Sequence, residues 1–245
     1  GLSAAMSGIF FWSFDIGGFA GPLPDMDLYR RSTQMAVFTP IMQWHSEPDG
    51  GQFRDLMPGA KGNNERSPWN IALANNRTEF IDEMRYWHNL RKELFPYIYN
   101  MALRTVKDDK PMMRPLIYDF EKDENVVHME DEYLFGDNML VAPLLEENAG
   151  TRKVYLPEGR WYDFFTGRLY EGGKYFLSDE ASKMPVYVKA GTAIPVKKEK
   201  QDVIFLYGEK GKDFLDSANV KIEWERNEIN VKEEWRGKAE WEFIK

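Results

Sequence analysis

One stretch of the 245-residue chain, residues 8–46, constrains the fold more than any other. It opens with the uncharged run 9–14, which is short, aromatic and preceded by glycine, as expected of a strand buried on both faces. A helix with Asp25 or Asp27 near its start should follow. A second apolar run, residues 38–42, completes a strand–helix–strand unit. The stretch therefore predicts neighbouring strands of a parallel α/β fold.

Polar side chains follow both predicted strands. Asp15 and the pair Gly17–Gly18 come after the first, and Gln43 and His45 come after the second. In a parallel barrel the carboxyl ends of all strands open onto one face, where the active site lies. We therefore expect a ligand-binding edge here. The alternative is structural: Asp15 caps the glycine turn and His45 is a satisfied packing residue.

Composition excludes several classes of protein. The net charge is −8 without a basic block, which argues against a nucleic-acid partner. No apolar run approaches the roughly 20 residues that cross a bilayer, so we expect no membrane partner. The chain has no cysteine, which excludes disulfides and thiolate metal sites and favours a reducing, cytoplasmic location. Hydrophobic residues make up 43% of the chain, enough for a sizeable core.

Residues 46–75 are rich in Gly, Pro, Asn and charge and predict a long loop that borders the same cleft. Within it, Arg66 or Trp69 either contacts a ligand or packs the loop down. A long helix should follow, with a capping-box-like start at Asn76 and a kink at Pro96. Its core face recurs at helical spacing: Phe80, Met84, Trp87, Leu94, Ile98 and Met101.

The period changes from about residue 111. Short apolar runs alternate with turn signals, which is typical of an antiparallel β-sandwich. These runs are residues 138–142, 152–156, 161–165, 185–188 and 193–196. The last 45 residues are dense in Lys and Glu, with two further β-type runs at 203–207 and 220–224.

Four segments resemble one known family. FDIGGFAG and DLYRRSTQMAVFTPIMQWH resemble the seventh and eighth strand segments of glycoside hydrolase family 31, the α-glucosidases and α-xylosidases. LPEGRWYDFFTGRLYEGG and MPVYVKAGTAIPV resemble the β-domain that follows its barrel. The resemblance implies an α/β part plus an all-β part: the C-terminal segment of a (β/α)8 TIM barrel, then an antiparallel β-sandwich. We place these parts at 1–110 and 111–200, with a distal β segment at 201–245.

The resemblance also implies roles for individual residues. Asp15 would accept hydrogen bonds from sugar hydroxyls and His45 would donate one, while Phe19 would form an apolar wall and Trp12 would reach the same subsite. Family members hydrolyse with two aspartates, and both precede the segment that this chain matches. We therefore expect no catalytic residue in the chain.

Two further points concern specificity and cofactors. Many relatives carry Arg where this chain has Gln43, two residues before the histidine, and this leaves the choice between α-glucoside and α-xyloside open. His45, His88 and His128 lack metal-ligand spacing, and Gly17–Gly18 is not part of a GxGxxG loop. We expect neither a metal nor a cofactor.

The leading hypothesis is the C-terminal part of a retaining α-glycoside hydrolase that acts on oligosaccharides and is inactive as this chain alone. Its partners would be the oligosaccharide substrate and the missing N-terminal half of the barrel, and an oligomer is possible. Two alternatives stay open: a non-catalytic carbohydrate-binding chain, and a structural chain that completes another polypeptide's barrel.

Overall fold

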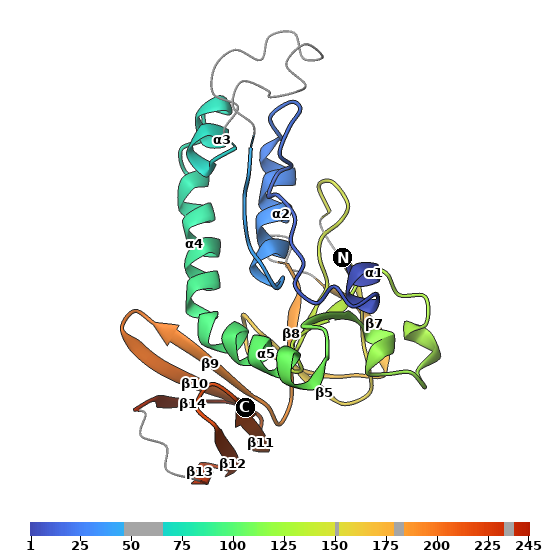
Figure 1. The fold of residues 1–245 in the computed structure, drawn as a ribbon, viewed down its shortest axis with the longest axis vertical. Helices are drawn as coiled ribbons and strands as arrows, with labels where there is room; N and C mark the ends of the chain where they lie inside the picture. The colour runs from blue at the N-terminus through green and yellow to red at the C-terminus, as the bar shows by residue number, and fades with distance from the viewer. Residues whose placement is uncertain (47–65, 150–151, 179–183, 233–237) are drawn as a thin grey trace.

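The computed structural model describes residues 1–46, 66–149, 152–178, 184–232 and 238–245. A helical part occupies one end of the molecule, and the β-strands occupy the other (Figure 1). The predicted order of an α/β segment followed by an all-β region is confirmed. The helices are α1 (Leu2–Met6), α2 (Met26–Val37), α3 (Pro68–Ala74), α4 (Phe80–Glu93) and α5 (Phe95–Asp108).

Local signals set the start of α2 and the break between α4 and α5. Asp25 caps α2, because its Oδ1 accepts a hydrogen bond from the backbone N–H of Leu28 at 2.7 Å. Leu94 lies between α4 and α5, and Pro96 lies in the first turn of α5. Since proline lacks an N–H and crowds the preceding turn, it interrupts the helix where the sequence predicted a kink.

Three local predictions are wrong. Asn76 does not cap α4; it has a positive φ of 53° in the turn after α3, and Glu79 occupies the N-cap position. Residues 68–74 of the predicted loop form α3, whose N-cap is Ser67. Most of that loop, residues 47–65, lies outside the described residues.

The third correction concerns the two predicted strands. Residues 9–14 and 38–42 do not form strands; the two segments run in parallel, and the residues that follow them, Asp15 and Gln43, form one isolated bridge. Ile9 and Phe11 are 55% and 42% exposed rather than buried. A parallel strand is stabilised by ladders on both sides and by cover on both faces, whereas the described residues give these segments a single bridge.

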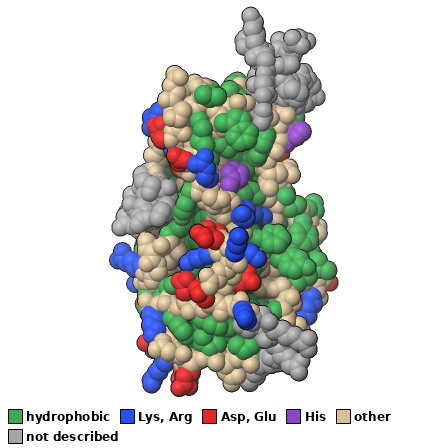
Figure 2. Space-filling model, turned by 90° about the vertical axis from the view of Figure 1, so that its left-hand side faces the viewer, with side chains coloured by type: hydrophobic (Ala, Val, Ile, Leu, Met, Phe, Trp, Pro, Cys, Tyr) green, Lys and Arg blue, Asp and Glu red, His purple; other side chains and the backbone are tan. Residues whose placement is uncertain are grey.

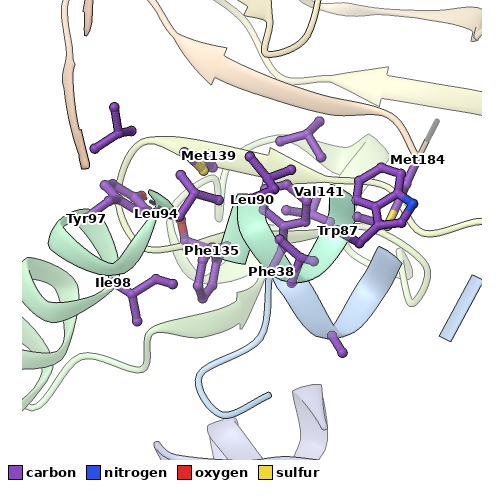
Figure 3. Close-up of a cluster of buried hydrophobic side chains, with 14 of the residues drawn as sticks. Phe38, Trp87, Leu90, Leu94, Tyr97, Ile98, Phe135, Met139, Val141 and Met184 are labelled. Atoms are coloured by element: carbon purple, nitrogen blue, oxygen red, sulfur yellow. Dashed lines mark hydrogen bonds between the residues drawn. The ribbon is translucent and has the colours of Figure 1, made fainter. Parts of the chain in front are cut away.

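The core face of α4 and α5 packs against a β-sheet. Trp87, Leu90, Leu94 and Tyr97 point from the helices toward the strands, as Figure 3 shows. All six residues predicted for this face are buried: Phe80, Met84, Trp87, Leu94, Ile98 and Met101.

That sheet has six antiparallel strands, in the order β1-β2-β3-β8-β5-β6. They are β1 (Met113–Pro115), β2 (Tyr133–Phe135), β3 (Met139–Val141), β8 (Val186–Lys189), β5 (Arg160–Asp163) and β6 (Leu169–Glu171). Side chains alternate between its faces, as strand geometry requires. Met139 and Val141 join the core with the helices, whereas Leu140 joins a second core.

The second core lies between this sheet and an antiparallel pair, β4 (Arg152–Leu156) and β7 (Lys174–Ser178). Val154 and Leu156 of β4 contribute to it, together with Trp161 and Tyr187 of the larger sheet. Two single 3₁₀ turns, Leu116–Tyr118 and Glu124–Val126, lie between β1 and β2. This arrangement is the predicted sandwich.

The terminal strands form two small sheets. One contains β9 (Ala193–Lys198), β10 (Gln201–Tyr207) and β14 (Glu240–Ile244), and the other contains β11 (Lys210–Leu215), β12 (Val220–Glu225) and β13 (Glu228–Lys232). β10 pairs with β14 in parallel, unlike the antiparallel pattern of the sandwich. β9 and β10 form a hairpin across residue 200, and the division of the chain there stays a prediction.

An ion-pair cluster ties the terminal sheets to α5. Arg104 donates to Asp137 at 2.7 Å, to Asp216 at 3.0 Å and to the carbonyl oxygen of Phe214 at 2.7 Å. Burial alone would raise the pKa of Asp137, but the hydrogen bond from Arg104 and the charges of Arg114 and Lys110 hold it well below the usual range.

Charged side chains of both signs are interspersed on the face of the molecule drawn in Figure 2, with hydrophobic surface between them. Among the described residues, no helix is both long enough and apolar enough to cross a membrane.

Candidate sugar-binding site

The site is built where the two parallel segments end. The backbone N–H of Ile16 donates to the carbonyl of Gln43 at 3.2 Å, and the N–H of Ile41 donates to the carbonyl of Trp12 at 3.4 Å. These bonds place Asp15 and Gln43 opposite each other. Paired residues of neighbouring extended segments present their side chains on the same face, so two polar groups meet here.

Asp15 is half-buried, and its Oδ1 accepts a hydrogen bond from Nε2 of Gln43 at 3.0 Å. The turn that follows is closed by the main chain instead, since the N–H of Gly18 donates to the carbonyl of Asp15 at 2.8 Å. The Asp15 side chain is therefore not needed as a cap for the glycine turn and can serve a ligand.

Gly17 is required by this turn. Its φ is +73°, and a Cβ at this position would lie 2.8 Å from a ring carbon of Tyr29. Its N–H donates to Oγ of Ser32 on α2 at 3.0 Å. The close approach fixes the turn against the helix and sets the position of the residues on either side.

Phe19 and His45 lie together, as the sequence predicts for residues of one subsite. Their rings are stacked, with centroids 5.9 Å apart and planes inclined by 16°. His45 is exposed and Phe19 is half-buried. An exposed imidazole beside an apolar ring can donate to a hydroxyl while the ring covers the C–H face of a sugar.

Trp12 is not brought to the same place. It stands three positions before Asp15, and an odd offset in an extended segment puts side chains on opposite faces. Trp12 packs against Phe14, with ring centroids 5.6 Å apart, and lines a different cavity of about 710 Å³ beside Leu2 and Met35.

Arg66 holds the site together, a role that its sequence context left open. It is 2% exposed and donates to the carbonyls of Gly17 at 2.7 Å and Gly21 at 2.6 Å. Its own N–H donates to Oγ of Ser46 at 3.2 Å, and its carbonyl accepts from the hydroxyl of Tyr29 at 2.7 Å. Burial lowers the pKa of its guanidinium. Arg66 therefore joins the loops after both segments and is enclosed by them.

Trp69, the other loop residue singled out, is 50% exposed and meets Trp44 edge to face, with centroids 6.5 Å apart. In the part of the chain that the structure describes, no three His, Cys, Asp or Glu side chains are grouped so as to hold a metal ion. The arrangement as a whole offers an acceptor, a donor and an apolar wall, which are the groups that bind a polyol.

Comparison with known proteins decides the family. The sequence model described as the TIM-barrel domain of glycosyl hydrolases family 31 matches residues 1–101. The model of the C-terminal domain of the same family matches residues 109–194. The chain belongs to glycoside hydrolase family 31.

Relatives within family 31 are longer than this chain. An isomaltosyltransferase of Sporosarcina globispora is 37% identical over 82% of this chain and 18% of its own length. A 1,3-alpha-isomaltosidase of Kribbella flavida is 38% identical over 78% of this chain and 25% of its own. The cycloalternan-forming enzyme of Listeria monocytogenes superposes with a TM-score of 0.81 at 32% identity, over 91% of this chain and 22% of that one. The chain thus spans about a quarter or less of these family 31 proteins.

Proposed function

We propose that this chain is the C-terminal part of a retaining α-glycosidase, the parent enzyme, in which Asp15, His45 and Phe19 form part of a sugar subsite. The observation that carries the proposal is where these side chains lie, at the ends of two parallel segments. Asp15 is paired with Gln43, and His45, two residues after Gln43, is stacked on Phe19. Relatives named alpha-glucosidase and alpha-xylosidase support the reaction class.

The catalytic pair is to be sought elsewhere in the parent enzyme. Retaining hydrolysis takes two carboxyl groups about 5–5.5 Å apart, one a nucleophile and the other an acid and base. Asp15 is engaged with an amide and is suited to binding a hydroxyl. The remaining barrel strands, supplied by the same polypeptide or by a second one, would cover the exposed sides of residues 9–14.

The substrate class that we favour is an α-glucosyl oligosaccharide that contains isomaltose units. The support is the printed names of two relatives, an isomaltosyltransferase and a 1,3-alpha-isomaltosidase. One of these names denotes a transferase, so transfer of the glycosyl group to a sugar instead of water is a second candidate reaction.

The test is the activity of the parent enzyme and of two variants toward an aryl α-glucoside. Asp15→Ala and His45→Ala should each lower kcat/KM by about 10²-fold, because hydrogen bonds to the sugar strengthen as its ring distorts in the transition state. The purified 245-residue chain should show no turnover. Near-parental kcat/KM in both folded variants would show that these residues are structural.

A further inference from the structure

Gln43 is placed to take part in the same subsite. It is exposed, and its backbone pairs with Asp15 in the parallel bridge. Its side chain crosses to the neighbouring segment, where Nε2 lies 3.0 Å from Oδ1 of Asp15. Gln43 therefore borders the carboxylate on the solvent-facing side, where the two parallel segments end.

The chemistry of the pair orients the amide. An ionised carboxylate only accepts hydrogen bonds, so the amide group toward Asp15 must be the NH₂. The carbonyl oxygen Oε1 then points away from Asp15. The pair presents two acceptors from adjacent segments: one oxygen of the carboxylate and the oxygen of the amide.

We propose that Gln43 is a specificity-determining residue of the sugar subsite, whose amide nitrogen fixes the Asp15 carboxylate and whose carbonyl oxygen accepts one sugar hydroxyl. This inference rests on the proposed function. Two acceptors on adjacent segments suit two hydroxyls of one sugar ring, each of which can donate one hydrogen bond.

The neutral amide matters for this role. A guanidinium at this position would pair with both oxygens of Asp15 in a bidentate fork and would itself bring donors only. The amide engages one carboxylate oxygen, leaves the negative charge in place and adds an acceptor. A site built in this way discriminates against sugars that lack the paired hydroxyl, since its polar groups are then left unpaired.

The experiment is a thermodynamic cycle in the parent enzyme that combines one substitution in the protein with the removal of one hydroxyl from the substrate. We would measure kcat/KM for an aryl α-glucoside and for its 2-, 3-, 4- and 6-deoxy analogues, with the parental protein and Gln43→Leu. Gln201→Leu is the matched control, because Gln201 is also exposed and lies on β10 of a terminal sheet. Thermal unfolding of each variant checks the fold.

The proposal predicts one deoxy position whose penalty is about tenfold in the parental enzyme and falls to about twofold or less in Gln43→Leu. Gln43→Glu should keep that preference, because it keeps an acceptor, yet lose at least about tenfold in kcat/KM on every substrate through repulsion of Asp15. Gln201→Leu should change nothing.

The outcomes separate the two claims. If Gln43→Leu lowers kcat/KM equally for all five glucosides, or if Gln43→Glu behaves like it, Gln43 makes no sugar contact and this inference is wrong. If the parental enzyme does not cleave the unmodified glucoside or a longer α-glucosyl oligosaccharide, the proposed function itself is wrong.

Discussion

Glu132 carries a buried carboxyl group immediately before β2, and replacing it with an amide tests the environment that the structure gives it. The residue is 2% exposed, and its Oε1 accepts a hydrogen bond from the N–H of Tyr155 on β4 at 2.9 Å. Among the described residues, Oε2 has no hydrogen-bond partner. Nη2 of Arg152 lies 3.9 Å from Oε1 of Glu132 but only 2.9 Å from Oδ2 of Asp131, so its closer ion pair is with Asp131.

This environment favours the neutral acid. Burial raises the pKa of Glu132 to about 8, the charge of Asp131 adds to the rise, and the Tyr155 N–H and Arg152 oppose it. The rise from the usual value of 4.5 corresponds to about 5 kcal/mol, at 1.36 kcal/mol for each pH unit. That is a large fraction of a typical domain stability of about 5–15 kcal/mol.

The sign of the effect follows from where the proton is held. Below pH 4.5 Glu132 is protonated in both states, so its burial is tolerated. Between pH 4.5 and about 8 the unfolded chain releases the proton while the folded chain keeps it, so the free energy of unfolding falls as pH rises. Above about pH 8 the loss is complete. Glu132→Gln should remove this dependence, since the amide keeps the acceptor for Tyr155 and carries no charge.

The assay is urea-induced unfolding of the full chain at pH 5, 7 and 9, followed by tryptophan fluorescence. Between pH 5 and 9 the parental protein should lose about 3–5 kcal/mol more than Glu132→Gln does. Glu130→Gln is the control, because Glu130 is an exposed neighbour, and it should follow the parental protein. If Glu132→Gln and the parental protein lose the same free energy within about 1 kcal/mol, the buried carboxyl is not protonated as argued.

Three further predictions concern the helices, the glycine turn and the parallel segments. Arg104→Met should destabilise the chain by about 2–3 kcal/mol in urea titrations, because Asp137, Asp216 and the carbonyl of Phe214 each lose a charged hydrogen-bond donor. Arg85→Met on the surface should change stability by less than about 1 kcal/mol, and similar values for both variants would contradict the ion-pair argument. Gly17→Ala should lower the thermal unfolding midpoint more than Gly8→Ala. Both glycines have a positive φ, but only at Gly17 would the new Cβ collide with the ring of Tyr29. Equal shifts of the midpoint would contradict this close approach. Amide hydrogen exchange in the isolated chain should be fast in residues 9–14 and slow in β3, and strong protection of both would show that the parallel segments are self-sufficient.

Sequence by itself determined those features that depend on near neighbours along the chain. The Asp25 cap, the interruption at Pro96 and the alternating faces of strands such as β3 follow from a side chain's reach to its own backbone, from proline's missing N–H and from a two-residue period. The family motif predicted Phe19 and His45 for one sugar subsite, and in the structure their rings are stacked.

Only the tertiary structure decided the features that depend on partners distant in sequence. Residues 9–14 have the composition of a buried strand, but a strand is stabilised by neighbouring ladders, and the part of the chain that the structure describes gives them a single bridge at their end, from Asp15 to Gln43. The direction of Trp12 and the amide of Gln43 on Asp15 follow from how two segments 28 residues apart are set in register. Arg66 shows the same limit: its sequence context allowed contact with a ligand or packing of the loop, and its burial against the carbonyls of Gly17 and Gly21 makes it the residue that fixes the site in place.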